Sequence, residues 1–171
     1  MVRKLVLLGT VIAIAAMVAA PSVLGHGNKP GSSTAMIGGG EVKVEFAGPE
    51  SKGRDVLSLL PPGGYWRMGA DRATTLTTDV ALKLGEMTVP KGSYTLVAHF
   101  DENKQWSLIV AEGLDAGDSS PTKVIARTSG TISKLDAAVE NMTIKLEASG
   151  DKGKLVLDWG TARLTAEFSA A

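Results

Sequence analysis

Five side chains that can recognise or react with a ligand lie in one short segment: Tyr65, Trp66, Arg67, Asp71 and Arg72. The aromatic rings can stack on a sugar or an aromatic ligand. Each guanidinium group can bind a carboxylate or phosphate through paired hydrogen bonds, and the aspartate can accept hydrogen bonds or receive a proton. Loops beside a rigid sheet often carry function. The segment is therefore the candidate ligand-binding site of the chain.

The same residues also fit a structural role. A tryptophan that leads into a strand can fill one end of a β-core, and an arginine can pair with Asp71 to make the loop rigid. Gly69 can supply a backbone conformation with positive φ. We prefer this structural interpretation and assign no catalytic residue in the segment.

An envelope hydrolase or lyase is the alternative, with Asp71 or His99 as the general acid or base. This chemistry requires either group to meet a second catalytic group in one pocket. The chain has only two histidines and no Gly-x-Ser-x-Gly nucleophile motif. A non-catalytic protein is the favoured expectation.

The sequence leads us to expect no metal and no cofactor. His26 could chelate copper if it became the N-terminus, but such a site normally needs a second histidine, and His99 lies in a predicted strand. Asp115 and Asp118 could offer oxygens to calcium, but the bidentate acid that closes a calcium loop is missing. The chain has no cysteine, which excludes disulfides and thiolate metal sites.

The N-terminus has the layout of an export signal. Arg3 and Lys4 precede an apolar run over residues 5–20, and small residues follow. The apolar run is interrupted at Gly9 and is shorter than the roughly 18 residues of a spanning helix. We expect a signal peptide over residues 1–25 and a product exported to the periplasm or the exterior.

The net charge of the chain limits the classes of molecule that it is expected to bind. The chain carries 18 basic and 18 acidic side chains, and loss of Arg3 and Lys4 leaves 16 against 18, a net charge of −2. No basic block appears, which argues against nucleic acid and against anionic membranes. The expected partner is a small ligand, a glycan or an envelope protein. No stable membrane insertion is expected after signal cleavage.

Alternating apolar and polar residues predict the elements that hold the candidate site. Residues 26–40 are rich in glycine and small polar residues and are expected to be a flexible lead. Short alternating runs separated by turn residues then predict an all-β, antiparallel sandwich, jelly-roll-like or related, over residues 41–171. Only residues 133–141 suit a helix. The expected strands are residues 41–46, 74–78, 80–84, 94–100, 106–110, 122–127, 142–147, 155–157 and 164–168.

Several linked motifs resemble the bacterial domain-of-unknown-function family 2911, and together they span about residues 37–168. The most specific is the family's Trp-Arg-x-Gly-Ala-Asn followed by Ala-Thr-Thr. The matching residues are Trp66-Arg67-Met68-Gly69-Ala70-Asp71 with Ala73-Thr74-Thr75, Pro49 with Gly53-Arg54, Pro61 with Gly63, Pro90-Lys91-Gly92-Ser93-Tyr94-Thr95-Leu96, Trp106, and Leu157-Asp158-Trp159.

The resemblance implies an exported bacterial β-domain and implies no activity. Two positions depart from the family pattern. Asp71 stands where the family usually has asparagine, and Gly48 replaces the larger residue usually seen before Pro49. The stretch from Glu112 to Thr131 matches poorly.

Overall fold

The computed structural model describes residues 27–60 and 62–171. The predicted signal peptide and His26 lie outside the described residues. Strands dominate the fold, together with one short 3-10 helix, η2, at Val56–Leu59. The strands are β1 Lys29–Ile37, β2 Gly40–Gly48, β3 Tyr65–Trp66, β4 Thr74–Thr78, β5 Leu82–Leu84, β6 Met87–Val89, β7 Gly92–Phe100, β8 Trp106–Ala111, β9 Val124–Ser149 and β10 Lys152–Ala170.

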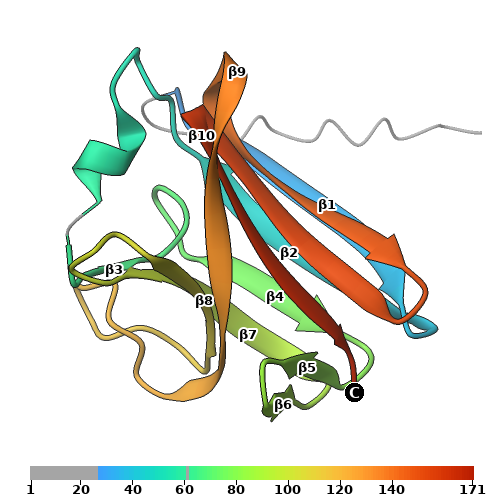
Figure 1. The fold of residues 1–171 in the computed structure, drawn as a ribbon. Helices are drawn as coiled ribbons and strands as arrows, with labels where there is room; N and C mark the ends of the chain where they lie inside the picture. Colours follow the sequence, from blue (N-terminus) through green and yellow to red (C-terminus); the bar gives the residue numbers. More distant parts are fainter. Residues whose placement is uncertain (1–26, 61) are drawn as a thin grey trace, which may run out of the picture.

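The strands form one antiparallel path in the order β1-β2-β4-β7-β8-β9-β10-β5-β6, with β3 added beside β7 (Figure 1). The all-β antiparallel class predicted from the sequence is confirmed. β9 pairs with β8 through its first residues and with β10 through the rest, so the path is continuous. The finer assignment to a sandwich of two stacked sheets stays a prediction.

Period-two alternation places the core on the inner face of the curled sheet. In β2, Val42, Val44 and Phe46 are buried while the residues between them are less buried. Leu96 of β7 and Leu157 of β10 belong to the same apolar cluster, although they are far apart in sequence. The predicted strand segments lie in or overlap β2, β4, β5, β7, β8, β9 and β10, as expected for strands with one apolar face.

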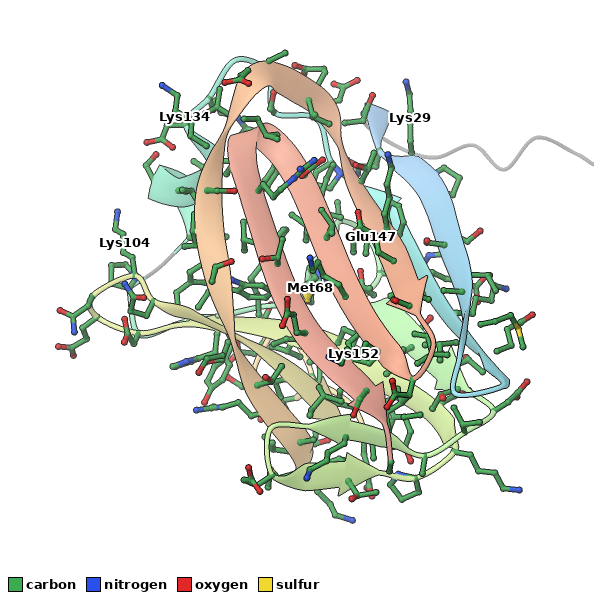
Figure 2. All side chains as sticks on the ribbon, turned by 45° about the vertical axis from the view of Figure 1, so that its right-hand side comes forward. Lys29, Met68, Lys104, Lys134, Glu147 and Lys152 are labelled. Carbon is green, nitrogen blue, oxygen red and sulfur yellow. The ribbon has the colours of Figure 1, made fainter. Side chains whose placement is uncertain are left out.

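β9 and β10 form two nested arches, with β10 inside β9 (Figure 2). β10 bends at Gly160, which has φ +56° and lies between two shifts in the pairing register with β9. The bend divides β10 into a first limb, residues 152–159, and a second limb, residues 161–170. A positive φ suits glycine because a side chain there would be strained.

Two local predictions were wrong. The lead predicted over residues 26–40 contains β1, which pairs with β2 from Lys29 to Ile37. Its small polar residues are poor strand formers, but pairing and packing decide strand formation more than propensity does. Residues 133–141, predicted to suit a helix, lie within β9 at the top of the arch, where Val139 pairs with Gly160.

Within residues 27–60 and 62–171, no helix has the length and apolar character needed to cross a membrane.

Candidate functional site

The two aromatic residues of the candidate site point to opposite faces of the sheet. Both belong to β3, where Tyr65 is opposite His99 and Trp66 is opposite Ala98. The Trp66 ring stacks on the Trp159 ring, with centroids 5.5 Å apart and planes at 18°, and packs against the main core. Tyr65 packs on a separate small cluster that includes Val97 and Ile109. The two rings therefore cannot share one ligand.

The backbone after Trp66 is closed by three hydrogen bonds. The hydroxyl of Thr74, which is fully buried, donates to the carbonyl of Met68 at 2.8 Å. The Thr74 amide donates to the carbonyl of Arg67 at 3.1 Å, and the Ala70 amide donates to the carbonyl of Ala47 on β2 at 2.9 Å. We call residues 66–74 the clasp, because these contacts join β3 and β4 to β2.

Met68 and Gly69 are the buried centre of the clasp. Met68 has no exposed surface, although its φ is +57°, and it lies inside the curled sheet (Figure 2). The prediction of a positive φ at Gly69 was wrong, since Met68 and Asp71 take the left-handed conformation instead. Gly69 is required for another reason. A Cβ there would lie 3.2 Å from the Ala47 carbonyl and 3.3 Å from the Thr74 hydroxyl, tighter than ordinary contact.

The charged residues of the segment lie at the surface. Asp71 is exposed, has φ +62°, and accepts a hydrogen bond from the Asn28 side chain at 2.9 Å. Arg67 is half-buried and Arg72 is exposed. Among the described residues no salt bridge joins either arginine to Asp71, so the expected Arg–Asp lock is not the contact that holds this corner.

His99 has a separate environment on the Tyr65 face. Its ring is 4.8 Å from the Tyr65 ring, centroid to centroid. Partial burial lowers the pKa of His99 from its usual value, Arg127 lowers it further, and Asp101 opposes the shift. The Asp101 carboxylate already accepts two backbone N–H groups of its own turn. Asp71 contacts Asn28 and is not among the groups that act on His99.

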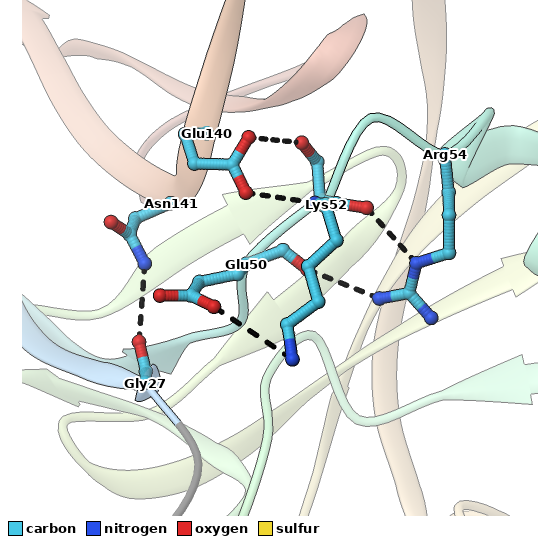
Figure 3. Close-up of polar contacts among 7 residues, drawn as sticks. Gly27, Glu50, Lys52, Arg54, Glu140 and Asn141 are labelled. Atoms are coloured by element: carbon cyan, nitrogen blue, oxygen red, sulfur yellow. Dashed lines mark hydrogen bonds and ion pairs between the residues drawn. The ribbon is translucent and has the colours of Figure 1, made fainter.

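A second polar site lies beside the clasp and was missed in the sequence. The turn that follows β2 docks on β9 through Glu140, whose carboxylate accepts the Ser51 hydroxyl and the Lys52 amide, each at 2.8 Å (Figure 3). The Arg54 guanidinium folds back onto the carbonyls of Ser51 and Glu50. The Pro-x-x-x-Gly-Arg motif marked this turn, but its partner lies in the stretch that was expected to be helical.

The hydrogen bonds at this turn stabilise the ionised form of Glu140. The Lys52 amide is the largest cause of the lowered pKa of Glu140, followed by the Ser51 hydroxyl. Lys52 and Gly53 have φ of +51° and +68°, which turns the chain so that the amide points at the carboxylate. The Glu140 carboxylate therefore serves as a hydrogen-bond acceptor that holds the turn on β9.

In the loop of Asp115 and Asp118, which was considered for calcium, the Asp118 carboxylate forms hydrogen bonds within the loop itself. Asp118 accepts the Ser120 hydroxyl and the Ser119 amide, and these two hydrogen bonds, the first more than the second, lower the pKa of Asp118. Such self-contained bonding is typical of an aspartate turn. Residues 27–60 and 62–171 contain no group of three or more histidine, cysteine or acidic side chains placed to hold a metal ion.

Comparison with known proteins gives one match. A family model described as "Protein of unknown function (DUF2911)" covers residues 29–168, from the first residue of β1 to two residues before the end of β10. No curated protein and no solved structure matches the chain. The resemblance found in the sequence motifs is confirmed, and the match includes β1 in the domain.

Proposed function

Because the chain belongs to the DUF2911 family of proteins of unknown function, we propose that it is an exported, non-catalytic β-sandwich module. In this proposal the clasp is architectural. It holds three strands together and leaves Arg67, Asp71 and Arg72 at the surface as contacts for an envelope partner, a glycan or a small ligand.

One observation carries the proposal: several residues of the most specific family motif make contacts inside the protein rather than facing solvent. Trp66 stacks on Trp159, Met68 has no exposed surface, and the Thr74 hydroxyl bonds to a buried carbonyl. A catalytic or binding loop would instead direct such groups toward a ligand.

The structure gives the alternative, an envelope hydrolase or lyase, little support. Asp71 accepts a hydrogen bond from Asn28 beside β1, whereas the His99 ring, on β7, contacts the Tyr65 ring at a tilt of 46°. A general acid or base must reach the reacting atom together with a second group. The contacts of Asp71 and of His99 do not converge on one another.

Export remains part of the proposal. It rests on the basic, apolar and small-residue layout of residues 1–25. Mass spectrometry of the protein produced in a bacterial host tests it: an exported fraction that begins at His26 supports cleavage, and a full-length protein confined to the cytoplasm contradicts export.

The architectural role of the clasp is tested by removing one hydroxyl. Thr74→Val leaves the buried Met68 carbonyl without its donor and should lower the free energy of unfolding by about 1–3 kcal/mol. Thr75→Val is the matched control, because Thr75 is exposed on the same strand, and it should change stability by less than about 0.5 kcal/mol. Urea unfolding measures both, and equal effects would refute a structural role for the hydroxyl.

A further inference from the structure

A groove lies at the other end of the molecule from the clasp. It opens where β5 and the turn between β9 and β10 meet the end of β10, and it encloses about 620 Å³. Small-ligand sites typically enclose about 300–1,000 Å³. None of the residues that line it belongs to the sequence motifs discussed above.

The two limbs of β10 face one another across this groove in a fixed register. The Ala170 amide donates to the Asp151 carbonyl at 2.7 Å, beside the turn. Farther up, Lys154 lies 3.9 Å from Glu167. At the bend, Arg163 and Asp158 form a two-point ion pair at 2.7 Å. All three contacts are centred on the same point, between Gly160 and Thr161, and the same centre matches Lys152 with Ser169.

This register places two lysines and two serines in one row that crosses β5, the two limbs of β10, and β9. Lys83 of β5 pairs with Ser169, Ser169 faces Lys152 across the gap, and Lys152 pairs with Ser149 of β9. All four line the groove, and both lysines are exposed. Ser169 separates the two lysines along this row, and both lysine side chains line the same groove. Their flexible ammonium groups can converge over Ser169.

We call the row of Lys83, Ser169, Lys152 and Ser149 the first row. The neighbouring row contains carboxylates, whereas the positive charges of the first row have no acidic partner in it. There Lys154 lies between Glu167, across the gap, and Glu147, its partner on β9. Glu167 forms an ion pair with Lys154 and Glu147 adds a second carboxylate to that row, whereas the first row contains no acidic residue. The first row is therefore the positive end of the groove.

The floor beside the positive row is apolar. The Phe168 ring lines the groove on one side and a small apolar space in the core on the other. It lies directly over Gly153, where a Cβ would be 2.5 Å from the ring. A ligand held by its charge at the first row would rest its carbon skeleton on this ring.

We propose that this groove binds a small organic anion, with its oxyanion group held by the Lys83 and Lys152 ammonium groups and the Ser149 and Ser169 hydroxyls. Ammonium and hydroxyl donors give charge-assisted hydrogen bonds to carboxylate and phosphate oxygens alike. Two classes of ligand present such an oxyanion, carboxylic acids and phosphate esters, and the experiment distinguishes them.

The test is a titration of the purified mature protein, followed by NMR at constant ionic strength, with benzoate and with inorganic phosphate as probes. Saturable shifts of the Ser149, Lys152 and Ser169 amides are expected. A stronger response to benzoate identifies a carboxylate ligand that uses the Phe168 floor, and a stronger response to phosphate identifies a phosphate ester.

The variant Lys83→Gln/Lys152→Gln should weaken binding of the preferred probe at least tenfold. Lys91→Gln/Lys134→Gln removes the same charge from exposed lysines outside the groove and should change affinity less than twofold. Melting curves of both variants should match the parent, since all four lysines are exposed. Linear shifts that never saturate, or equal losses in the two variants, would overturn the proposal.

Discussion

At the scale of the residue, the backbone conformation at position 71 explains why Asp71 is tolerated where asparagine is usual in similar sequences. Residue 71 has φ +62°, and asparagine and aspartate are the side chains that accept this conformation best. Asp71 accepts a hydrogen bond from the Asn28 amide, and an asparagine would also supply an acceptor oxygen there. The substitution therefore preserves the corner while adding an exposed charge.

Gly48 shows what the sequence alone could not predict. It was noted as a departure from the family pattern, but its cause is a long-range contact. A Cβ at Gly48 would meet the backbone carbonyl of Met142 on β9. Such an approach between segments far apart in sequence has no local signal.

The Gly48→Ala variant should therefore lose stability. Its new methyl group would push β9 away from β2, and overpacking of this kind costs about 1–3 kcal/mol. Gly113→Ala is the control, because its Cβ would find only ordinary contact with the Thr122 hydroxyl, and we expect a change below about 0.5 kcal/mol. Guanidinium unfolding of both variants provides the measurement. A Gly48→Ala protein as stable as its parent would show that β9 and β2 are not held this closely.

At the scale of the element, the sequence predicted strands where alternation was strong and failed where pairing decided the structure. Residues 142–147 and 155–157 were predicted correctly, but as separate strands rather than limbs of long arches. The connection at residues 133–141 has helix-compatible residues, yet its backbone is bound by β10. β1 was missed because its small polar residues gain their order from nine consecutive pairs with β2.

The docking of the turn after β2 on β9 should be visible in the pH dependence of stability. The folded pKa of Glu140 lies below its usual value of 4.5, because the folded carboxylate accepts the Lys52 amide and the Ser51 hydroxyl. The folded state thus gains stability from this group above the unfolded pKa. That gain disappears as the pH falls through the folded pKa.

Glu140→Gln should remove this acid-dependent part of the stability. Denaturation midpoints measured from about pH 6 to pH 3 should converge for parent and variant as the pH falls. The control is Glu86→Gln, in the exposed turn between β5 and β6, whose difference from the parent should vary less with pH. Parallel curves for the parent and Glu140→Gln would mean that this carboxylate does not hold the turn.

At the scale of the whole molecule, the two ends of the curled sheet differ in what their side chains do. The clasp and the Glu140 turn join β2, β4 and β9 through internal hydrogen bonds. The opposite end presents an open groove with uncompensated lysines. Composition and alternation predicted the all-β class. The contrast between the ends depends on pairings across the nested arches, which no stretch of sequence reveals by itself.

The central claim is that the clasp is architecture, and native-state hydrogen exchange of the Ala70 and Thr74 amides tests it most directly. These amides donate to carbonyls on β2 and within the clasp, so they should exchange only when the protein unfolds. Their opening free energies should equal those of the core amides of Val97 and Ile109. Exchange through local opening, at free energies well below those core values, would contradict the account and identify residues 66–74 as a mobile loop.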